Sequence, residues 1–337
     1  MKKSNWEGKN GPLLIAEIGG NHEGDFEYAK KLTQLAIEAN VDFIKYQLYS
    51  GDTLVSKLES PQRNKHFKKF ELSKEQYVEL AEICNKNNVG FMASVWDPEY
   101  VEWIDKYMPI YKIGSGDLTA YPMLKKFTEL QKPIIVSTGL STFKEVEDAV
   151  KYIQSQDELY KNSEYLSVLQ CTSMYPIPFT DANLNVMTEF GNKIGLPIGY
   201  SDHTEGSYAL EIAVAMGAQI LEFHFTDSRE NKEFRDHKVS LTRDEVLHLI
   251  EKIKLIDKLK GDKEKKPLPI EGDHPTTFRR AVYPIKDLKK GTVITEKDIT
   301  VLRPNHGIDA REYDNLLGKK LRVDVKEHQK LSWELFD

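Results

Sequence analysis

The chain has 337 residues, of which 40% are hydrophobic and 30% charged, and its formal net charge is −6 at pH 7. This composition is typical of a globular protein, and the acidic balance without a basic stripe argues against a nucleic-acid binder. The sequence contains no apolar run long enough for a membrane span and no apolar core of a signal peptide, so we expect a cytoplasmic protein that does not enter the membrane. The two cysteines, Cys84 and Cys171, are too few for a disulfide framework and are expected to be reduced.

Short apolar runs recur along the first two thirds of the chain, and amphipathic segments such as Glu27–Ala39 and Lys74–Asn87 follow them. Strands that alternate with helices indicate a parallel sheet, and this series predicts an α/β fold of the (β/α)8 TIM-barrel type. We expect Ser141 to cap the helix that follows it. The runs begin at Leu13, Phe43, Gly90, Pro109, Pro133, Tyr165, Leu196 and Gln219.

Each apolar run ends in polar residues. Active sites of TIM barrels are built at the C-terminal ends of the strands, so we expect these residues to form one ring. A single strand-end serine more often caps a helix than binds a ligand, and the prediction therefore depends on the convergence of the whole set. The set comprises Glu17, Lys45, Gln47, Ser94, Lys112, Ser115, Ser137, Thr138, Thr172, Ser173, Tyr175, Ser201, Asp202, His203, Glu222 and His224.

Two histidines, His203 and His224, end neighbouring strands of the predicted barrel. Adjacent strands lie about 4.8 Å apart, so both imidazoles are expected to face one ion. Two histidines with a carboxylate and open water positions suit a divalent metal such as Mn, Co, Fe or Zn. Glu222 is then a direct ligand or holds a metal-bound water. The alternative is a pair of hydrogen-bonded histidines without a metal.

Lys45 and Lys112 also end strands, and a lysine at a barrel mouth is costly unless it is paired or bound to an anion. Together with the strand-end hydroxyls and glycine-flanked N–H groups, they indicate a cradle for a small phosphorylated acid. Glu17 either forms an ion pair with Lys45 or acts as a general acid or base, and the two interpretations are compatible. A Schiff-base aldolase is the competing use of one barrel lysine.

The last part of the chain differs in composition from the barrel. We expect a catalytic barrel over residues 1–259, a linker rich in Lys, Pro and Gly over 260–278, and a small β-rich unit over 279–337 with a helix only near Ala310–Leu317. A unit of about 60 residues is near the lower limit for a domain that folds alone. We therefore expect it to pack on the barrel or on a partner subunit.

An ordered series of motifs resembles the sialic acid synthase family, which includes N-acetylneuraminate, legionaminic and pseudaminic acid synthases. The barrel motifs are AEIGGNHEG at Ala16, IKYQ at Ile44, YKIGSGD at Tyr111, STG at Ser137, QCTSMYP at Gln170, GYSDHT at Gly199, LEFHFT at Leu221 and RDHKVSL at Arg235. The tail resembles the antifreeze-like (SAF) domain of the family, with FRRAVY at Phe278 and LRP at Leu302. The resemblance covers nearly the whole chain.

The resemblance implies a phosphoenolpyruvate-dependent transferase. In the family, C3 of phosphoenolpyruvate attacks the aldehyde of an open-chain N-acyl hexosamine such as N-acetylmannosamine, and a divalent metal polarises that aldehyde. Water then adds at C2, and phosphate leaves by cleavage of the C–O bond. The implied metal is manganese, with magnesium and cobalt as alternatives.

The resemblance also implies roles for individual residues. His203 and His224 match the metal ligands, with Glu222 acting through a water, and the catalytic matches are Glu17, Lys45 and Asp236. The phosphoenolpyruvate contacts are matched by Lys45, Ser94, Lys112, Ser115, Ser137, Ser173 and Ser201. The sugar contacts are matched by Gln47, Tyr175, Asp236, Phe278 and Arg303, the last supplied by the partner protomer of a domain-swapped homodimer.

The sequence departs from the family pattern on the sugar side. Phe223 replaces a common basic residue, Phe234-Arg235 replaces Gly-Pro, Asn305 replaces a frequent glycine, and residues 56–73 lack a clear match. A diacetamido sugar or a sugar 6-phosphate is therefore an alternative substrate. Such a phosphate would meet a basic loop, which is otherwise solvated and contains Arg63, Lys65, Lys68 and Lys69.

More remote alternatives keep the fold and change the activity. They are a Schiff-base pyruvate aldolase, another phosphoenolpyruvate-condensing barrel of the Kdo-8-phosphate synthase type, and a non-catalytic binding barrel. The SAF-like tail argues against the first two. The retention of Glu17, both histidines and the lysines argues against the third.

Overall fold

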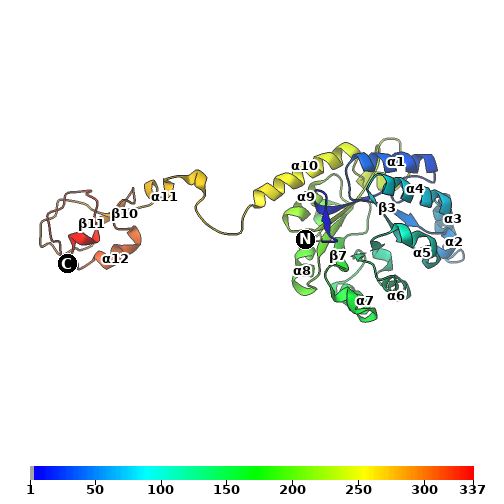
Figure 1. Cartoon of the computed structure of the whole chain (residues 1–337), viewed down its shortest axis with the longest axis horizontal. Helices are drawn as coiled ribbons and strands as arrows, with labels where there is room; N and C mark the ends of the chain where they lie inside the picture. The colour runs from blue at the N-terminus through cyan, green and yellow to red at the C-terminus, as the bar shows by residue number, and fades with distance from the viewer. Residues whose placement is uncertain (1–3) are drawn as a thin grey trace. The chain divides into compact units, whose positions relative to one another are not determined.

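The computed structural model describes residues 4–337 and divides the chain into two units, Met1–Gly261 and Asp262–Asp337 (Figure 1). The N-terminal segment, in which we expected no signal peptide, begins with residues 1–3, and these three lie outside the described residues. In the described part of the chain, no helix is long and apolar enough to cross a membrane.

Eight parallel strands of the first unit form the predicted barrel (Figure 1). Hydrogen-bonded neighbours follow the order β4-β3-β2-β9-β8-β7-β6-β5, and β4 contacts β5, so that the sheet nearly closes on itself. The short strand β1 (Glu7–Gly8) pairs antiparallel with β2. The barrel strands are β2 (Gly11–Glu17), β3 (Phe43–Leu48), β4 (Gly90–Val95), β5 (Tyr111–Ile113), β6 (Ile134–Ser137), β7 (Leu166–Cys171), β8 (Ile198–Asp202) and β9 (Ile220–His224). Each lies within or overlaps one predicted apolar run, and the TIM-barrel prediction is confirmed.

Two-residue alternation along the strands separates the barrel interior from the helix-covered surface. Leu14 and Ala16 pack outward in the large cluster between strands and helices, whereas Leu13 and Ile15 belong to a second buried cluster. Because side chains of one face recur every two residues, the next position on the inner face of β2 is Glu17. The same two-residue spacing relates Met92 to Ser94 and other residues of the inner cluster to the polar residues at the strand ends. An apolar layer inside the barrel therefore lies directly below the polar strand ends. The inner cluster consists of Trp6, Leu13, Ile15, Met92, Ile110, Ile135, Leu169 and Ile220.

Helices surround the barrel and bury one apolar face each. The predicted helices over Glu27–Ala39 and Lys74–Asn87 are confirmed within one residue at each end as α1 and α4. The segment expected to be a basic loop is partly helical, because Pro61 occupies the first turn of α3, where its missing N–H costs nothing. The helices are α1 (Phe26–Glu38), α2 (Gly51–Leu54), α3 (Pro61–Lys69), α4 (Lys74–Lys86), α5 (Val101–Ile104), α6 (Tyr121–Thr128), α7 (Phe143–Gln156), α8 (Asn185–Lys193), α9 (Tyr208–Ala215) and α10 (Arg243–Lys260).

The cap of α7 differs from our expectation. The hydroxyl of Thr142 accepts a hydrogen bond from the backbone N–H of Glu145, and the carboxylate of Glu145 accepts one from the N–H of Thr142. In a capping box the partner stands three positions after the cap, a spacing that Thr142 and Glu145 satisfy. The prediction of Ser141 as the cap was therefore wrong by one residue.

The second unit has its own small core. It contains α11 (His274–Thr277), the antiparallel pair β10 (Ala281–Pro284) and β11 (Ile299–Leu302), and α12 (Tyr313–Leu316) after a 3-10 turn. The strands were expected from the β-like runs of the tail, and α12 agrees with the prediction near Ala310–Leu317, whereas α11 falls in the segment expected to be a linker. The core residues include Val282, Leu288, Ile294, Ile299, Leu316, Leu321, Leu331 and Phe336.

We expect Thr142→Ala to lower the free energy of unfolding of the barrel by about 1 kcal/mol, because it removes the side-chain cap of α7. Ser141→Ala serves as the matched control and should leave the stability unchanged. Denaturant unfolding followed by circular dichroism measures both values. Equal losses in the two variants would contradict the assignment of the cap.

Candidate functional site

The C-terminal ends of the barrel strands enclose a cavity of about 1160 Å³. Phe278 and Arg303 belong to the second unit, where the guanidinium of Arg303 lies 5.5 Å from the centroid of the Phe278 ring. Three residues of the predicted ring, Thr138, Thr172 and Asp202, do not line the cavity, and their side chains are hydrogen-bonded to Leu169, Asp181 and Thr204 instead. The other candidate site residues line it, namely Glu17, Lys45, Gln47, Ser94, Lys112, Ser115, Ser137, Ser173, Tyr175, Ser201, His203, Glu222, His224 and Asp236. Their functional roles stay a prediction.

Two lysines and two glutamates form the charged centre of the cavity, and all four are buried. Glu17 and Lys45 are register partners on β2 and β3, and the Lys45 Nζ lies 2.8 Å from Glu17 Oε2. Glu222 Oε2 lies 3.9 Å from Lys45 Nζ and 3.7 Å from Lys112 Nζ and accepts no hydrogen bond. The expected Glu17–Lys45 ion pair is present.

The protonation of this centre follows from burial and charge. Burial raises the pKa of Glu17 against the opposing effect of Lys45. Burial disfavours the charge of Glu222, but Lys112 and Lys45 outweigh burial and lower its pKa. Burial also lowers the pKa of Lys112. Of the two glutamates, Glu17 is therefore the one whose carboxylate more readily accepts a proton, as a general base requires.

Serine hydroxyls gather near Lys112 at the ends of β5 (Ser115), β6 (Ser137) and β7 (Ser173). Lys112 Nζ donates to Ser137 Oγ at 2.6 Å, and the backbone N–H of Gly139 donates to Ser115 Oγ at 2.9 Å. A Cβ atom on Gly139 would lie 2.2 Å from Ser173 Oγ and 2.9 Å from Ser115 Oγ. Glycine at this position is therefore required for the two hydroxyls to converge. Such a group of hydroxyls, N–H donors and ammonium groups can bind phosphate or carboxylate oxygens.

The two histidines lie side by side, with ring centroids 5.3 Å apart. His203 Nδ1 lies 2.7 Å from the carbonyl oxygen of Thr172, so this nitrogen carries a proton, and Nε2 is the nitrogen that could bind a metal after losing its own proton. His224 Nδ1 is buried without a hydrogen bond and lies 3.8 Å from Asp236 Oδ2. Burial lowers the pKa of His203, but Cys171 and the Thr172 carbonyl outweigh burial and raise it to about 9.

The donor set fits a divalent metal that keeps open positions. Metal-binding histidines usually donate their other ring N–H to a carboxylate or a backbone carbonyl, and His203 has this arrangement with Thr172. The orphaned, buried nitrogen of His224 lacks the bond that the metal-free interpretation requires. Within residues 4–337, no group of three or more His, Cys, Asp or Glu side chains is arranged to hold an ion. The remaining positions would thus belong to water or substrate oxygens, as in catalytic sites.

The outer wall of the cavity is aromatic and basic. Arg235 has its guanidinium 4.6 Å from the Tyr175 ring centroid and its Nε 3.2 Å from Asp236 Oδ1. Of the four basic residues in segment 56–73, Arg63 and Lys69 line the cavity. Lys68 instead forms a 2.7 Å ion pair with Asp52, and Lys65 is exposed outside the cavity lining.

Two departures from the family pattern fall outside the cavity lining. Phe223 is 1% exposed and packs in the core between strands and helices, because it alternates with the inward-facing Glu222 and His224. Asn305 supports the second unit, since its N–H donates to the Thr276 carbonyl at 2.8 Å. Neither departure changes the lining of the barrel cavity.

The structure adds cavity residues that the sequence analysis missed. Trp96 and Asp117 each lie two residues beyond a predicted serine, Ser94 and Ser115, and the two-residue alternation could have identified them. Burial raises the pKa of Asp117 to about 6. Cys171 also lines the cavity beside His203, although we considered only its redox state. The sequence analysis also missed three aromatic lining residues of α3 and its C-cap, His66, Phe67 and Phe70, because they do not follow a strand end.

Comparisons with known proteins agree with this architecture. The chain is 34% identical to an N,N'-diacetyllegionaminic acid synthase of Campylobacter jejuni over 94% of this chain and 98% of the relative. It is 32% identical to the human N-acetylneuraminate-9-phosphate synthase over 98% and 95%. A crystal structure of the N-acetylneuraminic acid synthetase from Leptospira borgpetersenii superposes with a TM-score of 0.72 at 30% identity, covering 79% of this chain and 90% of that one.

Family models match both units. Residues 32–265 match the NeuB family, and residues 279–337 match the SAF domain. The first match covers more than half of the chain, and the relatives named above are synthases, so the protein is an enzyme. The chain therefore belongs to the NeuB family and carries a C-terminal SAF domain.

Proposed function

We propose that this enzyme is a nonulosonic acid synthase. It condenses phosphoenolpyruvate with an N-acyl hexosamine such as N-acetylmannosamine and releases phosphate by C–O cleavage. The observation that carries the proposal is the convergence of two buried lysines, a row of serines and two glutamates beside a histidine pair in one cavity. A diacetamido sugar is the second candidate substrate, favoured by the similarity to a legionaminic acid synthase.

The lysines and serines bind phosphoenolpyruvate. Lys112 donates only to the neutral oxygens of Ser137 and Ile113, and its nearest carboxylate oxygen is 3.7 Å away. A buried ammonium group whose carboxylate partner lies beyond hydrogen-bond distance is only partly compensated, which favours binding of the phosphate or carboxylate of the substrate there. Lys45 and the serines at positions 94, 115, 137, 173 and 201 complete the set of donors.

Glu17 serves as the acid–base residue. Its Oε1 accepts a hydrogen bond of 2.8 Å from Gln47 Nε2, and its Oε2 faces Lys45, so the carboxyl is held in one orientation. The new carbon–carbon bond joins C3 of phosphoenolpyruvate to the aldehyde carbon, which leaves C2 open to water. Glu17 accepts a proton from the water that adds at C2, and this proton passes to the former aldehyde oxygen, which becomes a hydroxyl. The C2–O bond to phosphate then breaks, and the proton of the new C2 hydroxyl leaves with the phosphate to give the keto group.

His203 and His224 would hold the divalent metal, with Glu222 acting through a water, and manganese is proposed ahead of magnesium and cobalt. When bound, the metal supplies a Lewis acid for the sugar aldehyde. Because Nδ1 of His203 is hydrogen-bonded to the Thr172 carbonyl, Nε2 is the ring nitrogen that would bind the metal.

The sugar is bound by residues from both units. Gln47, Tyr175 and Asp236 contribute from the barrel, and Asp236 also takes part in catalysis. Phe278 and Arg303 contribute from the SAF domain of a partner in a cytoplasmic, domain-swapped homodimer. The contact between Arg303 and the Phe278 ring supports their action as one unit. We retain the division into a barrel (1–259), a linker (260–278) and the SAF domain (279–337).

Phosphate release from phosphoenolpyruvate tests the proposal. With manganese, we expect release to require one member of a panel of N-acetylmannosamine, its 6-phosphate and diacetamido sugars, and a chelator should abolish it. Release with a single sugar would identify the substrate. Absence of release with every sugar, or trapping of pyruvate on a lysine by borohydride, would overturn the synthase assignment.

Replacement of the acid–base residue should separate chemistry from binding. We expect Glu17→Gln to lower kcat by about 10² to 10⁴-fold, because the amide cannot accept the proton, while phosphoenolpyruvate still binds to the lysines and serines. Steady-state kinetics and calorimetric titration measure the two effects. Glu79→Gln, on the exposed face of α4, is the control. A kcat within threefold of the wild type would remove Glu17 from its proposed role.

Complementation tests the domain swap. Glu17→Gln disables the barrel, and Arg303→Ala disables the sugar contact of the tail, so each homodimer should be nearly inactive. In a mixed dimer, a normal barrel meets the normal tail of the other chain, and we expect recovery of up to about half of the sites in each mixed dimer. Phosphate release after co-expression of the two variants measures this recovery. No recovery, with mixed dimers shown by differently tagged chains, would exclude contribution of Arg303 in trans.

A further inference from the structure

The β9–α10 loop (residues 225–242) carries Arg235 and Asp236 into the cavity. Its ends are joined by pairing of Phe225 with Leu241, so the loop leaves the barrel and returns at the same place. The part between contains only the 3-10 turn Arg235–Val239, whose own hydrogen bonds do not fix its orientation over the cavity. Contacts from outside the loop must therefore hold Asp236 in position.

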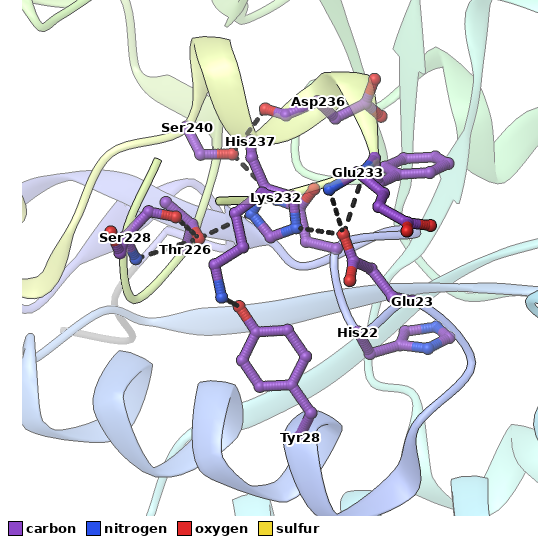
Figure 2. Close-up of polar contacts among 12 residues, drawn as sticks. His22, Glu23, Tyr28, Thr226, Ser228, Lys232, Glu233, Asp236, His237 and Ser240 are labelled. Carbon is purple, nitrogen blue, oxygen red and sulfur yellow. Dashed lines mark hydrogen bonds and ion pairs between the residues drawn. The ribbon is translucent and has the colours of Figure 1, made fainter. Parts of the chain in front are cut away.

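Glu23, between β2 and α1, makes the central contact with this loop. Figure 2 shows its side chain pointing toward Glu233 and His237, with dashed contacts at one carboxylate oxygen. Glu23 Oε1 accepts hydrogen bonds from the backbone N–H groups of Glu233 and Phe234, both at 3.0 Å. Burial disfavours the charge of Glu23, but these two N–H groups and His237 outweigh burial and lower its pKa. The ionised carboxylate thus binds the main chain two and three residues before Asp236.

The backbone of Glu23 is held in an unfavourable conformation. Its φ angle is +53°, in the left-handed region that glutamate rarely adopts. Asparagine or glycine would occupy this conformation at lower cost. A glutamate at such a position indicates that its side chain has a task that the smaller residues cannot perform.

His237 extends the contact on the far side of Asp236. Its ring is 1% exposed, Nε2 lies 3.4 Å from Glu23 Oε1, and Nδ1 lies 2.7 Å from Thr226 Oγ1. Nδ1 is hydrogen-bonded to the threonine hydroxyl, which also donates to the Ser228 carbonyl, whereas Nε2 makes no hydrogen bond and lies at ion-pair distance from the carboxylate. The Glu23 carboxylate is thus hydrogen-bonded to the main chain just before Asp236 and faces the His237 ring just after it.

The segment before Glu23 adds two further contacts. Asn21 Nδ2 donates to Ser240 Oγ at 2.8 Å, and Ser240 Oγ donates to the carbonyl oxygen of Asp236 at 2.7 Å. A Cβ atom on Gly20 would lie 2.5 Å from the Phe234 ring, so glycine at this position allows the aromatic ring to lie against the segment. The loop with the unusual Phe234-Arg235 pair is therefore fitted to residues 20–23.

We propose that Glu23 is a positioning residue for the sugar half of the site, which fixes the β9–α10 loop so that Arg235 and Asp236 face the cavity. The expected effect on the KM of the sugar rests on the proposed function, whereas the positioning of the loop does not. Among the described residues, Glu23 forms no hydrogen bond or ion pair with Lys45 or Lys112, and it reaches His224 only through Asp236, whose Oδ2 lies 3.8 Å from His224 Nδ1. The loss of Glu23 should therefore impair sugar use selectively.

The test compares Glu23→Ala and Glu23→Gln with a matched pair, Glu164→Ala and Glu164→Gln. Glu164 is also a partly buried carboxylate that accepts a backbone N–H, from Asn5 at 2.8 Å, but it lies outside the cavity lining. We expect Glu23→Ala to raise the KM of the sugar about tenfold or more, as loss of a hydrogen bond to a charged group does, with the KM of phosphoenolpyruvate within twofold. Glu23→Gln keeps one acceptor oxygen and should be intermediate. The Glu164 variants should change neither KM.

Hydrogen–deuterium exchange of the ligand-free protein gives a readout that needs no activity. Glu23→Ala should accelerate exchange in peptides spanning 229–240, where the N–H groups of Glu233 and Phe234 lose their acceptor, and the Glu164 variants should not. If Glu23→Ala does not fold, the same measurements on Glu23→Gln decide the matter. Unchanged exchange in this segment would overturn the inference, as would equal rises in both KM values. An inactive wild type would refute the proposed function alone, because the exchange measurement would still test the loop.

Discussion

The buried pairing of charges at the barrel mouth is the constraint on which the rest of the site depends. Two ammonium groups cannot be buried without nearby anions, and here the partners are two carboxylates on adjacent strands. The pairing of Glu17 with Lys45 requires that β2 and β3 stay in one register. A slip of one residue would turn both charges toward the helices, where apolar side chains pack. The apolar cluster below the mouth and the charged centre above it thus specify the same alignment of strands.

Much of this arrangement could be predicted because barrels obey a simple periodicity. The apolar runs identified the strands, and the polar strand ends identified the charged centre, the serines and the histidine pair of the cavity. Thr138, Thr172 and Asp202 were also expected there but do not line it. Ser141 was misassigned by one residue, because serine and threonine are both good caps and only the reciprocal bond to Glu145 distinguishes them. Trp96 and Asp117 follow the same alternation but lie beyond the ends of the strands, where we did not extend it.

Other features could not have been predicted from any local pattern. The side chains of α3 reach the cavity because aromatic packing brings His66 and Phe70 against Phe234, 168 and 164 positions away in the chain. Such contacts depend on how long loops fold over a barrel, and loop conformation carries little sequence signal. The strand-borne cavity residues are accordingly those with the clearest interpretation, whereas the departures from the family that reach the cavity, Phe234-Arg235 and the segment 56–73, are borne by loops and by α3.

The contact of Glu23 with the β9–α10 loop has a consequence for how this protein can change. The carboxylate binds main-chain N–H groups, which every residue except proline possesses. The side chains at positions 233 and 234 can therefore be exchanged without removing the bonds that hold the loop. A protein with such a main-chain anchor can explore new sugar specificities by mutation while its loop backbone, and the strand-borne chemistry beneath it, remain in place.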